Sequence, residues 1–405
     1  MRIAMVSEHA NPMAVLGGVD AGGQNVHVAA LSTALARLGH RVSVYTRRDN
    51  KDAPATSRLC RGVTVTLVEA GPAEPIPKDE LLPFMDEFGD KLADRFLLRR
   101  PAVVHGHFWM SGLAALRGAQ PCGVPVVQTY HALGSVKRRH LGAGDSSPAA
   151  RIAAEVTVGR RAARIVATCT DEVSELVRMG LDPDRISVVP CGVDTTHFVP
   201  HGPVARRTER PRLLVVGRLV ERKGIDAVVR ALAALPDAEL LIAGGPQEGP
   251  VEADPQVRHL IEVATEVGVR ERVDFLGSVA RDELPALLRS ADAVVCVPWY
   301  EPFGIVPLEA MACGTPVVAA AVGGLRDTVV DGVNGLLVPP RDVEALTRAL
   351  RELLDRPEWA RELGRAGVRR AGTRYSWERV ARETAEIYRS LIVEDVPGRN
   401  KVVTG

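Results

Sequence analysis

Short apolar runs alternate along the chain with longer segments in which apolar residues recur at the spacing of a helix. A short run bounded by turn residues is typical of a buried strand, and the longer segments are typical of amphipathic helices. The strands expected in the first half are 3–7, 41–46, 63–68, 102–105, 124–128, 164–167 and 186–189, and the expected helices include 22–38, 79–98 and 148–161. This alternation predicts βα units that feed a parallel sheet.

The pattern begins again after residues 198–210, which hold proline, glycine and charge without periodicity and are typical of a linker. The strands expected beyond it are 213–217, 238–243, 272–276, 293–297, 316–319 and 335–338. The expected helices are 225–234, 256–267, 281–290, 307–313, 342–355, 358–371 and 377–391. We therefore predict an α/β protein with two doubly wound, Rossmann-like domains, 1–197 and 211–375. A last helix, 376–395, is long enough to reach back to the first domain.

Length and composition agree with this division. A chain of 405 residues fits two domains of about 200 residues each, and 46% hydrophobic with 25% charged residues is typical of globular proteins rather than disordered or fibrous ones. The formal net charge is only +1, so no long-range field would attract nucleic acid. Any anion that the protein binds must be held by local groups.

The cysteines and the start of the chain indicate the compartment. The six cysteines are scattered, without a C-x-x-C pair or a dense framework, so we expect reduced thiols and a cytoplasmic protein. The segment 1–8 turns polar too soon for a signal peptide, and no apolar run is long enough to span a bilayer. Peripheral contact with a membrane stays open, and nothing in the sequence indicates an oligomeric state.

Two loops could bind phosphate. Gly17 and Gly18, and then Gly22 and Gly23, precede the first helix, where glycine lets a phosphate approach free backbone N–H groups. The dinucleotide fingerprint G-x-G-x-x-G is absent, which argues against a nicotinamide or flavin enzyme. The alternative is a loop that needs glycine only to turn.

The second loop follows the first strand of the second domain and carries Arg218 and Lys223. Arg218 could reach a diphosphate as a fork-shaped donor and Lys223 as a point charge. The alternative is a solvated charged loop.

The segment 299–316 carries two glutamates after a strand. Glu301 lies on the turn, Pro307 suits the first position of a helix, and Glu309 would lie in the first turn of that helix. Both carboxylates would then face one end of the sheet. The simpler interpretation is that Glu309 complements the helix dipole and that Glu301 is a solvated turn residue.

This segment resembles a family of retaining glycosyltransferases that includes sucrose-phosphate synthases, bacterial mannosyltransferases and the inositol-phosphate N-acetylglucosaminyltransferase of mycothiol synthesis. The family's signature is two glutamates separated by seven residues, which Glu301 and Glu309 match. The resemblance extends over 17–47, 216–224 and 301–340. It implies the GT-B fold, with two facing Rossmann-like domains, parallel sheets and a C-terminal helix that crosses back to the first domain.

The resemblance also implies how a nucleotide-sugar donor is held. The backbone N–H groups of Gly22 and Gly23 would meet the donor diphosphate, and Arg218 and Lys223 would neutralise it. The other donor contacts would come from Glu301 on the sugar hydroxyls, from Glu309 on the ribose, from His131 beside the sugar, and from the backbone of Phe303, Gly304 and Ile305 against sugar and phosphate.

The chemistry expected of such a site needs neither metal nor cofactor. As the diphosphate leaves, its charge grows and the sugar becomes oxocarbenium-like, so fixed cations and N–H dipoles stabilise the transition state. Retention in the family is ascribed to attack on the same face, with a donor phosphate oxygen taking the proton of the acceptor. His105 and His107 share one face of a strand and could suggest a metal site, but no third ligand lies nearby in the sequence.

The acceptor side departs from the relatives. Lys78 and Arg151 resemble positions that grip inositol phosphate in the mycothiol enzyme. Phe108 and Ala132 stand where that enzyme has tyrosine and threonine, so two phosphate-binding hydroxyls are missing and inositol phosphate is disfavoured. The basic segment 135–140 could bind an acceptor phosphate, touch an anionic membrane, or be a solvated loop.

The predicted partners are therefore a nucleotide-sugar donor and a small hydroxylated acceptor, which could carry a phosphate as in sucrose-phosphate synthases. By family frequency, uridine diphosphate sugars come ahead of guanosine diphosphate mannose. A nucleotide-sugar 2-epimerase of similar two-lobed fold and a non-catalytic nucleotide-sugar binder are the alternatives. The epimerase would need no acceptor.

Overall fold

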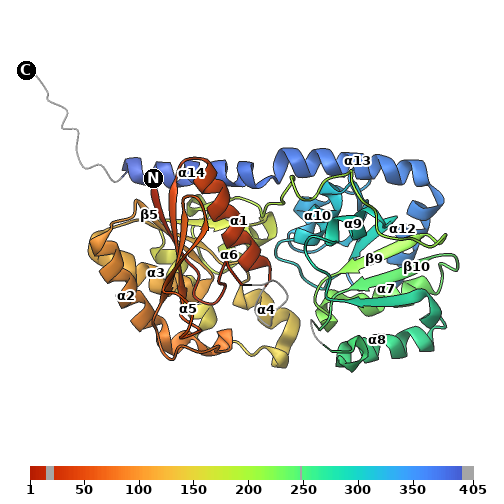
Figure 1. Ribbon diagram of the computed structural model, residues 1–405, viewed down its shortest axis with the longest axis horizontal. Helices are drawn as coiled ribbons and strands as arrows, with labels where there is room; N and C mark the ends of the chain where they lie inside the picture. Colours follow the sequence, from red (N-terminus) through yellow and green to blue (C-terminus); the bar gives the residue numbers. More distant parts are fainter. Residues whose placement is uncertain (15–21, 247–248, 395–405) are drawn as a thin grey trace, which may run out of the picture. The chain divides into compact units, whose positions relative to one another are not determined.

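The computed structural model describes residues 1–14, 22–246 and 249–394 (Figure 1). They form two compact units. Unit 1 holds Met1–Ala167, Val173–Val189 and the chain from Val380 onward, and unit 2 holds Thr168–Glu172 and Pro190–Arg379. The last helix therefore returns the chain to unit 1.

Unit 1 is built on an eight-stranded sheet of order β3-β4-β2-β1-β5-β6-β7-β8. The strands are β1 (Arg2–Val6), β2 (Arg41–Arg47), β3 (Thr56–Cys60), β4 (Val63–Val68), β5 (Val103–His107), β6 (Val126–Thr129), β7 (Arg164–Ala167) and β8 (Ile186–Val188). Neighbours run parallel, except that β3 pairs antiparallel with β4. All five residues of β5 are buried, as expected for a parallel strand covered on both faces.

The helices of unit 1 are α1 (Gly23–Arg37), α2 (Met85–Leu98), α3 (Trp109–Ala119), α4 (Gly134–Leu141), α5 (Arg151–Arg161), α6 (Thr170–Arg178) and α14 (Trp377–Glu394), of which the last two begin in unit 2. Short 3-10 turns lie at Lys78–Glu80, Leu82–Phe84, Gln120–Cys122, Gly142–Gly144 and Pro183–Arg185. α3 packs on β5 and β6 together with α2 and α5, and α1 packs on β2 and β4 (Figure 1).

Two sequence predictions for unit 1 are corrected. The helix expected over 79–98 is broken into two 3-10 turns before α2 begins at Met85, because Pro83 has no N–H to continue a helical ladder. The basic segment 135–140, for which a loop was one interpretation, lies within α4.

The order of the strands has a reversal point in unit 1. From β1 the chain builds outward on one side through β2 and on the other through β5. In a doubly wound sheet, ligands bind outside the carboxyl ends of the strands at the point where the order reverses. In unit 1 that point lies between β1 and β5.

Unit 2 is built on a six-stranded parallel sheet of order β11-β10-β9-β12-β13-β14. The strands are β9 (Arg212–Val216), β10 (Glu239–Ala243), β11 (Val273–Gly277), β12 (Ala293–Cys296), β13 (Val317–Ala320) and β14 (Leu336–Val338). The helices are α7 (Ile225–Leu232), α8 (Pro255–Glu266), α9 (Leu284–Arg289), α10 (Ile305–Ala312), α11 (Leu325–Thr328), α12 (Val343–Asp355) and α13 (Pro357–Arg374), with 3-10 turns at Glu221–Lys223, Val251–Ala253 and Arg270–Arg272.

Alternate residues of β9 enter different cores. Leu213 and Val215 pack with α7, α8 and α12, whereas Leu214 packs with α9 and α10. Because helices cover both faces, the strand reads as one apolar run rather than an alternating one. The reversal of strand order falls between β9 and β12.

The boundary between the units lies earlier than the sequence predicts. The chain enters unit 2 at Pro190, and the segment 198–210 is part of that unit rather than a free linker. Phe198 is buried beside Leu214, and the Ala205 amide donates to the carbonyl of Ala286 at 3.0 Å. These contacts are isolated in the sequence, so they leave no periodic pattern.

In the part of the chain that the structure describes, every helix falls short of the length and apolar character that crossing a membrane requires.

Two leucines of α2 test the packing of unit 1. Leu92 is fully buried and Leu98 is 89% exposed. We expect Leu92→Ala to lower the free energy of unfolding by about 2–5 kcal/mol, since it removes buried methyl groups and leaves a cavity. Leu98→Ala should change it by less than about 0.5 kcal/mol. Urea titrations of the two variants check this, and equal losses would contradict the packing of α2.

Candidate functional site

The loop that follows β9 is shaped by a glycine. Gly224 has φ +66, and a Cβ placed there would lie 2.3 Å from the carbonyl oxygen of Val297. A side chain is therefore excluded on both conformational and steric grounds. This close approach holds the turn Glu221–Lys223 against the end of β12, and the Trp299 amide donates to the Arg222 carbonyl at 2.8 Å.

Lys223 and Glu301 form an ion pair at this place. Glu301 follows β12, and its carbonyl accepts a hydrogen bond of 2.9 Å from the Gly324 amide. Burial alone would raise the pKa of Glu301, but the charge of Lys223 and its hydrogen bond hold that pKa below its ordinary value. Arg222 and the Phe303 amide act in the same direction. Glu301 is therefore ionised, and its charge is compensated by cations from the other loop.

Arg218 lies on the same loop as Lys223 and is exposed. Its side chain makes no ion pair with the residues that the structure describes. The structure thus brings Lys223 and Glu301 together and leaves the Arg218 guanidinium open to solvent.

The helix that carries Glu309 starts earlier than predicted. α10 begins at Ile305 behind Gly304, which has φ +74, so Pro307 is its third residue and Glu309 its fifth. The expectation that Glu309 lies in the first turn is wrong, because the left-handed Gly304 and not Pro307 starts the helix. The backbone of Phe303 and Gly304 leads into this helix end, and Ile305 is its first residue.

Glu309 is buried, and its carboxylate meets the Arg281 guanidinium at 3.3 Å. Burial raises the pKa of Glu309 to about 7, although Arg281 lowers it in part. Near neutral pH this carboxyl can both donate and accept hydrogen bonds. A group of that kind suits a pair of vicinal hydroxyls.

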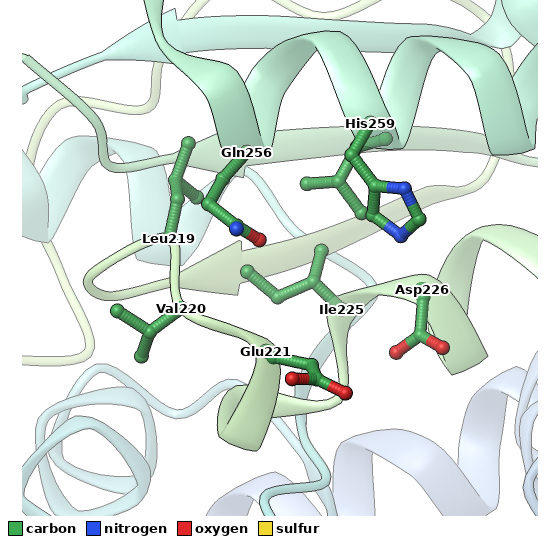
Figure 2. A pocket seen from close by; sticks show the side chains of 8 residues that line it. Leu219, Val220, Glu221, Ile225, Asp226, Gln256 and His259 are labelled. Carbon is green, nitrogen blue, oxygen red and sulfur yellow. The ribbon is translucent and has the colours of Figure 1, made fainter. Parts of the chain in front are cut away.

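Two pockets lie beside α7. One, of about 280 Å³, is shown in Figure 2, where Glu221 and Asp226 line it from the turn and α7, and Gln256 and His259 from α8. The other, of about 340 Å³, includes Trp299 and Arg341. Neither is lined by the predicted site residues.

In unit 1 a cluster of histidines occupies the ends of β5 and β6. The two nitrogens of His105 meet the Tyr388 hydroxyl at 2.6 Å and the Thr129 hydroxyl at 2.9 Å. His107 Nδ1 and His131 Nε2 are hydrogen-bonded at 3.0 Å, with the rings stacked. Burial lowers the pKa of His105 to about 3 and the pKa of His107 and of His131 well below the ordinary value. The cluster is therefore neutral.

The backbone is strained at two members of this region. Phe108 has φ +85 and His131 has φ +63, values that residues with a Cβ adopt rarely. Such conformations persist only where the surroundings impose them, and they concentrate at functional sites. The pattern His105-Gly106-His107 indicates the shared face of two histidines, but no local signal points to Tyr388, which comes from α14.

Three of the four predicted acceptor residues are brought together. Arg151 is buried, donates to the Ala132 carbonyl at 2.7 Å and lies 5.1 Å from the Phe108 ring centre. It also forms an ion pair of 2.8 Å with Glu155. Burial raises the pKa of Glu155 even though Arg151 opposes this. Lys78, the fourth, is only partly buried.

Two of the cations of α4, Lys137 and Arg139, are paired with carboxylates. Lys137 lies 3.4 Å from a carboxylate oxygen of Asp79 and 3.1 Å from one of Asp145. Arg139 makes two hydrogen bonds, of 2.8 and 2.7 Å, with Glu175. The charges of Lys137 and Arg139 are thus offset within unit 1.

The glycine-rich loop is described only in part. Gly17 and Gly18 lie outside the described residues. Gly22 precedes α1, and its amide donates to the Asn25 side chain at 3.0 Å. A Cβ at Gly22 would meet no described atom within 4 Å, so space is open beside it.

Among the described residues, no group of three or more histidine, cysteine, aspartate or glutamate side chains is arranged to hold a metal ion.

The chain matches known glycosyltransferases over nearly its whole length. Residues 21–197 match the model "Glycosyltransferase Family 4", and residues 201–370 match "Glycosyl transferases group 1". The D-inositol 3-phosphate glycosyltransferase of Acidothermus cellulolyticus is 39% identical over 97% of this chain and 91% of its own length. That of Frankia alni is 38% identical over 95% and 98%.

This chain belongs to the same glycosyltransferase family. Sucrose-phosphate synthase from Thermosynechococcus elongatus matches it with a TM-score of 0.88 and 32% identity, over 97% of this chain and all of the other. HepE of Anabaena, solved with UDP and glucose, has a TM-score of 0.73 at 19% identity over 96% and 99%, and shares the fold. The resemblance seen in the sequence is confirmed, and the protein is a GT-B glycosyltransferase.

The buried Glu309 makes a prediction for stability. Its pKa is about 7 in the folded protein against 4.5 as the ordinary value, so between these pH values the folded state binds more protons. Its contribution to stability is present below about pH 4.5 and is lost as the pH rises through 7. Relative to Glu309→Gln, the parent should lose about 3 kcal/mol over that range, at about 1.4 kcal/mol per pKa unit. Urea titrations of both proteins at several pH values check this, and parallel profiles would contradict it.

Proposed function

We propose that this glycosyltransferase moves a sugar from a nucleoside diphosphate donor to a small hydroxylated acceptor and retains the configuration of the sugar. The observation that carries the proposal is the Lys223–Glu301 ion pair, which lies beside Arg218 and the start of α10. A diphosphate that reaches Lys223 replaces Glu301 as the partner of that cation. The released carboxylate is then free to bind sugar hydroxyls.

The remaining donor contacts follow from the chemistry of each group. Arg218 supplies a second cation, exposed and without an ion pair among the described residues. Glu309, with a pKa near neutrality, binds the two ribose hydroxyls. His131 lies beside the sugar as a neutral ring, which can hydrogen-bond a hydroxyl without adding positive charge next to an oxocarbenium-like centre.

The reaction is driven by stabilisation of the leaving group. Negative charge grows on the diphosphate as the bond to the sugar breaks, and Lys223 and Arg218 are positioned for that charge before it develops. The acceptor hydroxyl attacks the face that the diphosphate leaves. A phosphate oxygen takes its proton, and the new bond forms with retention.

The substrates are proposed by class. A uridine diphosphate sugar is placed first and guanosine diphosphate mannose second. Because the curated relatives are named for D-inositol 3-phosphate, this compound and unphosphorylated myo-inositol are the first acceptors to test. All six cysteines are free thiols, which supports a cytoplasmic location.

The test of the proposal is transfer itself. The protein is incubated with UDP-glucose, UDP-N-acetylglucosamine or GDP-mannose, with and without each acceptor, and the products are resolved by mass and by NMR. A glycoside with the anomeric configuration of the donor supports the proposal. A 2-epimer formed from the donor alone, or an inverted glycoside, would overturn it.

The role of Lys223 gives a kinetic prediction. Lys223→Ala should lower kcat by about 100- to 1,000-fold, the range seen when one preorganised group that stabilises a growing negative charge is removed. The dissociation constant of the donor should change far less, because the diphosphate carries less charge in the ground state. Turnover and calorimetry measure the two effects.

Lys91→Ala serves as the matched control, because Lys91 is an exposed lysine of α2 far from these residues in the sequence. Its kcat should equal that of the parent. Equal kcat in Lys223→Ala and the parent would remove Lys223 from the mechanism.

The proposed mechanism assigns charge neutralisation to side chains, so it predicts no requirement for a divalent cation. EDTA should leave the initial rate within about twofold of the untreated enzyme. Rates measured with EDTA, and again with added manganese or magnesium, check this. Activity that EDTA abolishes and manganese restores would show that a metal takes part.

A further inference from the structure

The amino ends of the strands of unit 1 carry a row of arginines that the proposed function does not use. Four neighbouring strands contribute to it, with Arg61 before β4, Arg41 at the start of β2, Arg2 at the start of β1, and Arg99 and Arg100 before β5. Neighbouring strands lie about 5 Å apart, so the row is dense. All five residues are exposed. None makes an ion pair with a residue that the structure describes, and we call the row the arginine edge.

Carboxylates are scarce where these strands begin. No aspartate or glutamate occurs in the connections into β2, β4, β5, β6 and β7, which are residues 38–40, 61–62, 99–102, 120–125 and 162–163. Asp182 and Asp184 come in the connection into β8, the last strand of the sheet. Burial lowers the pKa of His40, and the positive charges of the N-terminus and of Arg389 lower it further. The positive charge of this edge is therefore not compensated by its own loops.

The sheet of unit 2 has opposite charges paired at the same strand positions. β9 and β10 stand at the reversal point as β1 and β2 do. Arg212 at the start of β9 is aligned with Glu239 at the start of β10, and the two form an ion pair of 2.7 Å. In unit 1 Arg2 is aligned with Arg41 in the same way. Like charges at aligned positions destabilise a sheet, so an anion outside the chain would remove a cost that the fold of unit 1 carries.

Two exposed leucines adjoin the arginine edge. Leu97 and Leu98 end α2 and are 61% and 89% exposed, and Arg99 and Arg100 follow them directly. Each leucine would gain free energy by leaving water. At an interface an arginine buries its apolar stem and pairs its guanidinium with phosphate. Apolar side chains among cations are typical of a protein surface that lies on an anionic bilayer, whereas nucleic acid offers phosphates but no medium that would take up leucine.

We infer that unit 1 docks on an anionic membrane through the arginine edge, with Leu97 and Leu98 entering the boundary between headgroups and acyl chains. The inference does not depend on the proposed function. Docking at the amino ends of the strands leaves uncovered their carboxyl ends, where Phe108 and the histidine cluster lie. The basic segment 135–140 is less suited to this role, because Lys137 and Arg139 are already paired with carboxylates.

Sedimentation with vesicles tests the docking. The parent should bind vesicles of phosphatidylcholine mixed with phosphatidylglycerol, and should bind them less at high salt because salt screens the attraction between charges. It should not bind vesicles of phosphatidylcholine alone. The inference is overturned if the mixed vesicles are not bound or if both kinds are bound equally. A DNA duplex bound by the parent as tightly as the mixed vesicles would identify a surface for polyanions in general and not for a membrane.

Two double variants separate charge from apolar contact. Arg41→Gln with Arg99→Gln should lower the partition coefficient on mixed vesicles by about 25-fold, at about fivefold for each arginine. Leu97→Ser with Leu98→Ser should lower it by about tenfold or more, since two apolar side chains no longer enter the bilayer. Thermal unfolding verifies that each variant is folded. Binding at the level of the parent by either double variant would refute the inference.

Unit 2 supplies the matched controls. Arg365→Gln with Arg369→Gln removes the same charge from exposed positions of α13, and Val333→Ser removes an exposed apolar side chain. Both proteins should bind the mixed vesicles as the parent does. If the α13 variant lost as much binding as the variant of the arginine edge, total charge and not this edge would decide the binding, and the inference would be wrong.

Hydrogen exchange locates the contact on the parent. When mixed vesicles are added, the amides of residues 97–102 should exchange more slowly, because the membrane excludes water from that connection. Residues 290–292, the connection into β12 at the corresponding place in unit 2, should not change. If bound protein shows unchanged exchange at 97–102, it docks by another surface and the inference fails.

Discussion

The pairing of Lys223 with Glu301 is the interaction on which the candidate site of unit 2 depends. Each charge is partly removed from water, and neither would be stable there alone. The pairing requires that two loops from different strands meet, and they meet because Gly224 lets the backbone approach the carbonyl of Val297. The ion pair therefore depends on the backbone conformation at Gly224. The ion pair compensates both charges, and in the proposed function a diphosphate gains the Lys223 cation by replacing Glu301 as its partner.

Both units have a doubly wound parallel sheet, but the side chains at the strand ends are charged in one unit and neutral in the other. At the ends of β9 and β12, cations and carboxylates are kept ionised by one another, as the lowered pKa of Glu301 shows. At the ends of β5 and β6, burial keeps His105, His107 and His131 neutral. In the proposed function, the diphosphate needs fixed charge, whereas a neutral ring beside an oxocarbenium-like sugar adds no positive charge to oppose its formation. The different charge states of these two groups of side chains follow from burial as much as from residue type.

The sequence predicted the central parallel strands well because they are apolar runs buried on both faces, as β5 and β10 are. β4 and β7, for example, have the bounds expected from the sequence. The edge strand β3 was missed because its residues are partly exposed and show no apolar run. The predicted start of α10 was wrong because proline is common at the first position of a helix, which pointed to Pro307. The left-handed conformation of Gly304, which begins the helix instead, is set by the fold and has no local signal in the sequence. Pairs such as His105 with Tyr388 join residues far apart in the chain, so no local pattern could reveal them.

Arg151 matches a position of the family by resemblance, but its surroundings are not those of a cation that is free to bind an anion. The resemblance assigned it to an acceptor phosphate, and the structure does bring it beside Phe108 and Ala132. Its charge, however, is already opposed by the buried Glu155. A guanidinium in that state orders the surrounding backbone through the Ala132 carbonyl and adds little net attraction for an anion. In the proposed function, the selectivity for the acceptor therefore depends less on this cation than on the shape and the hydrogen-bonding groups around Phe108.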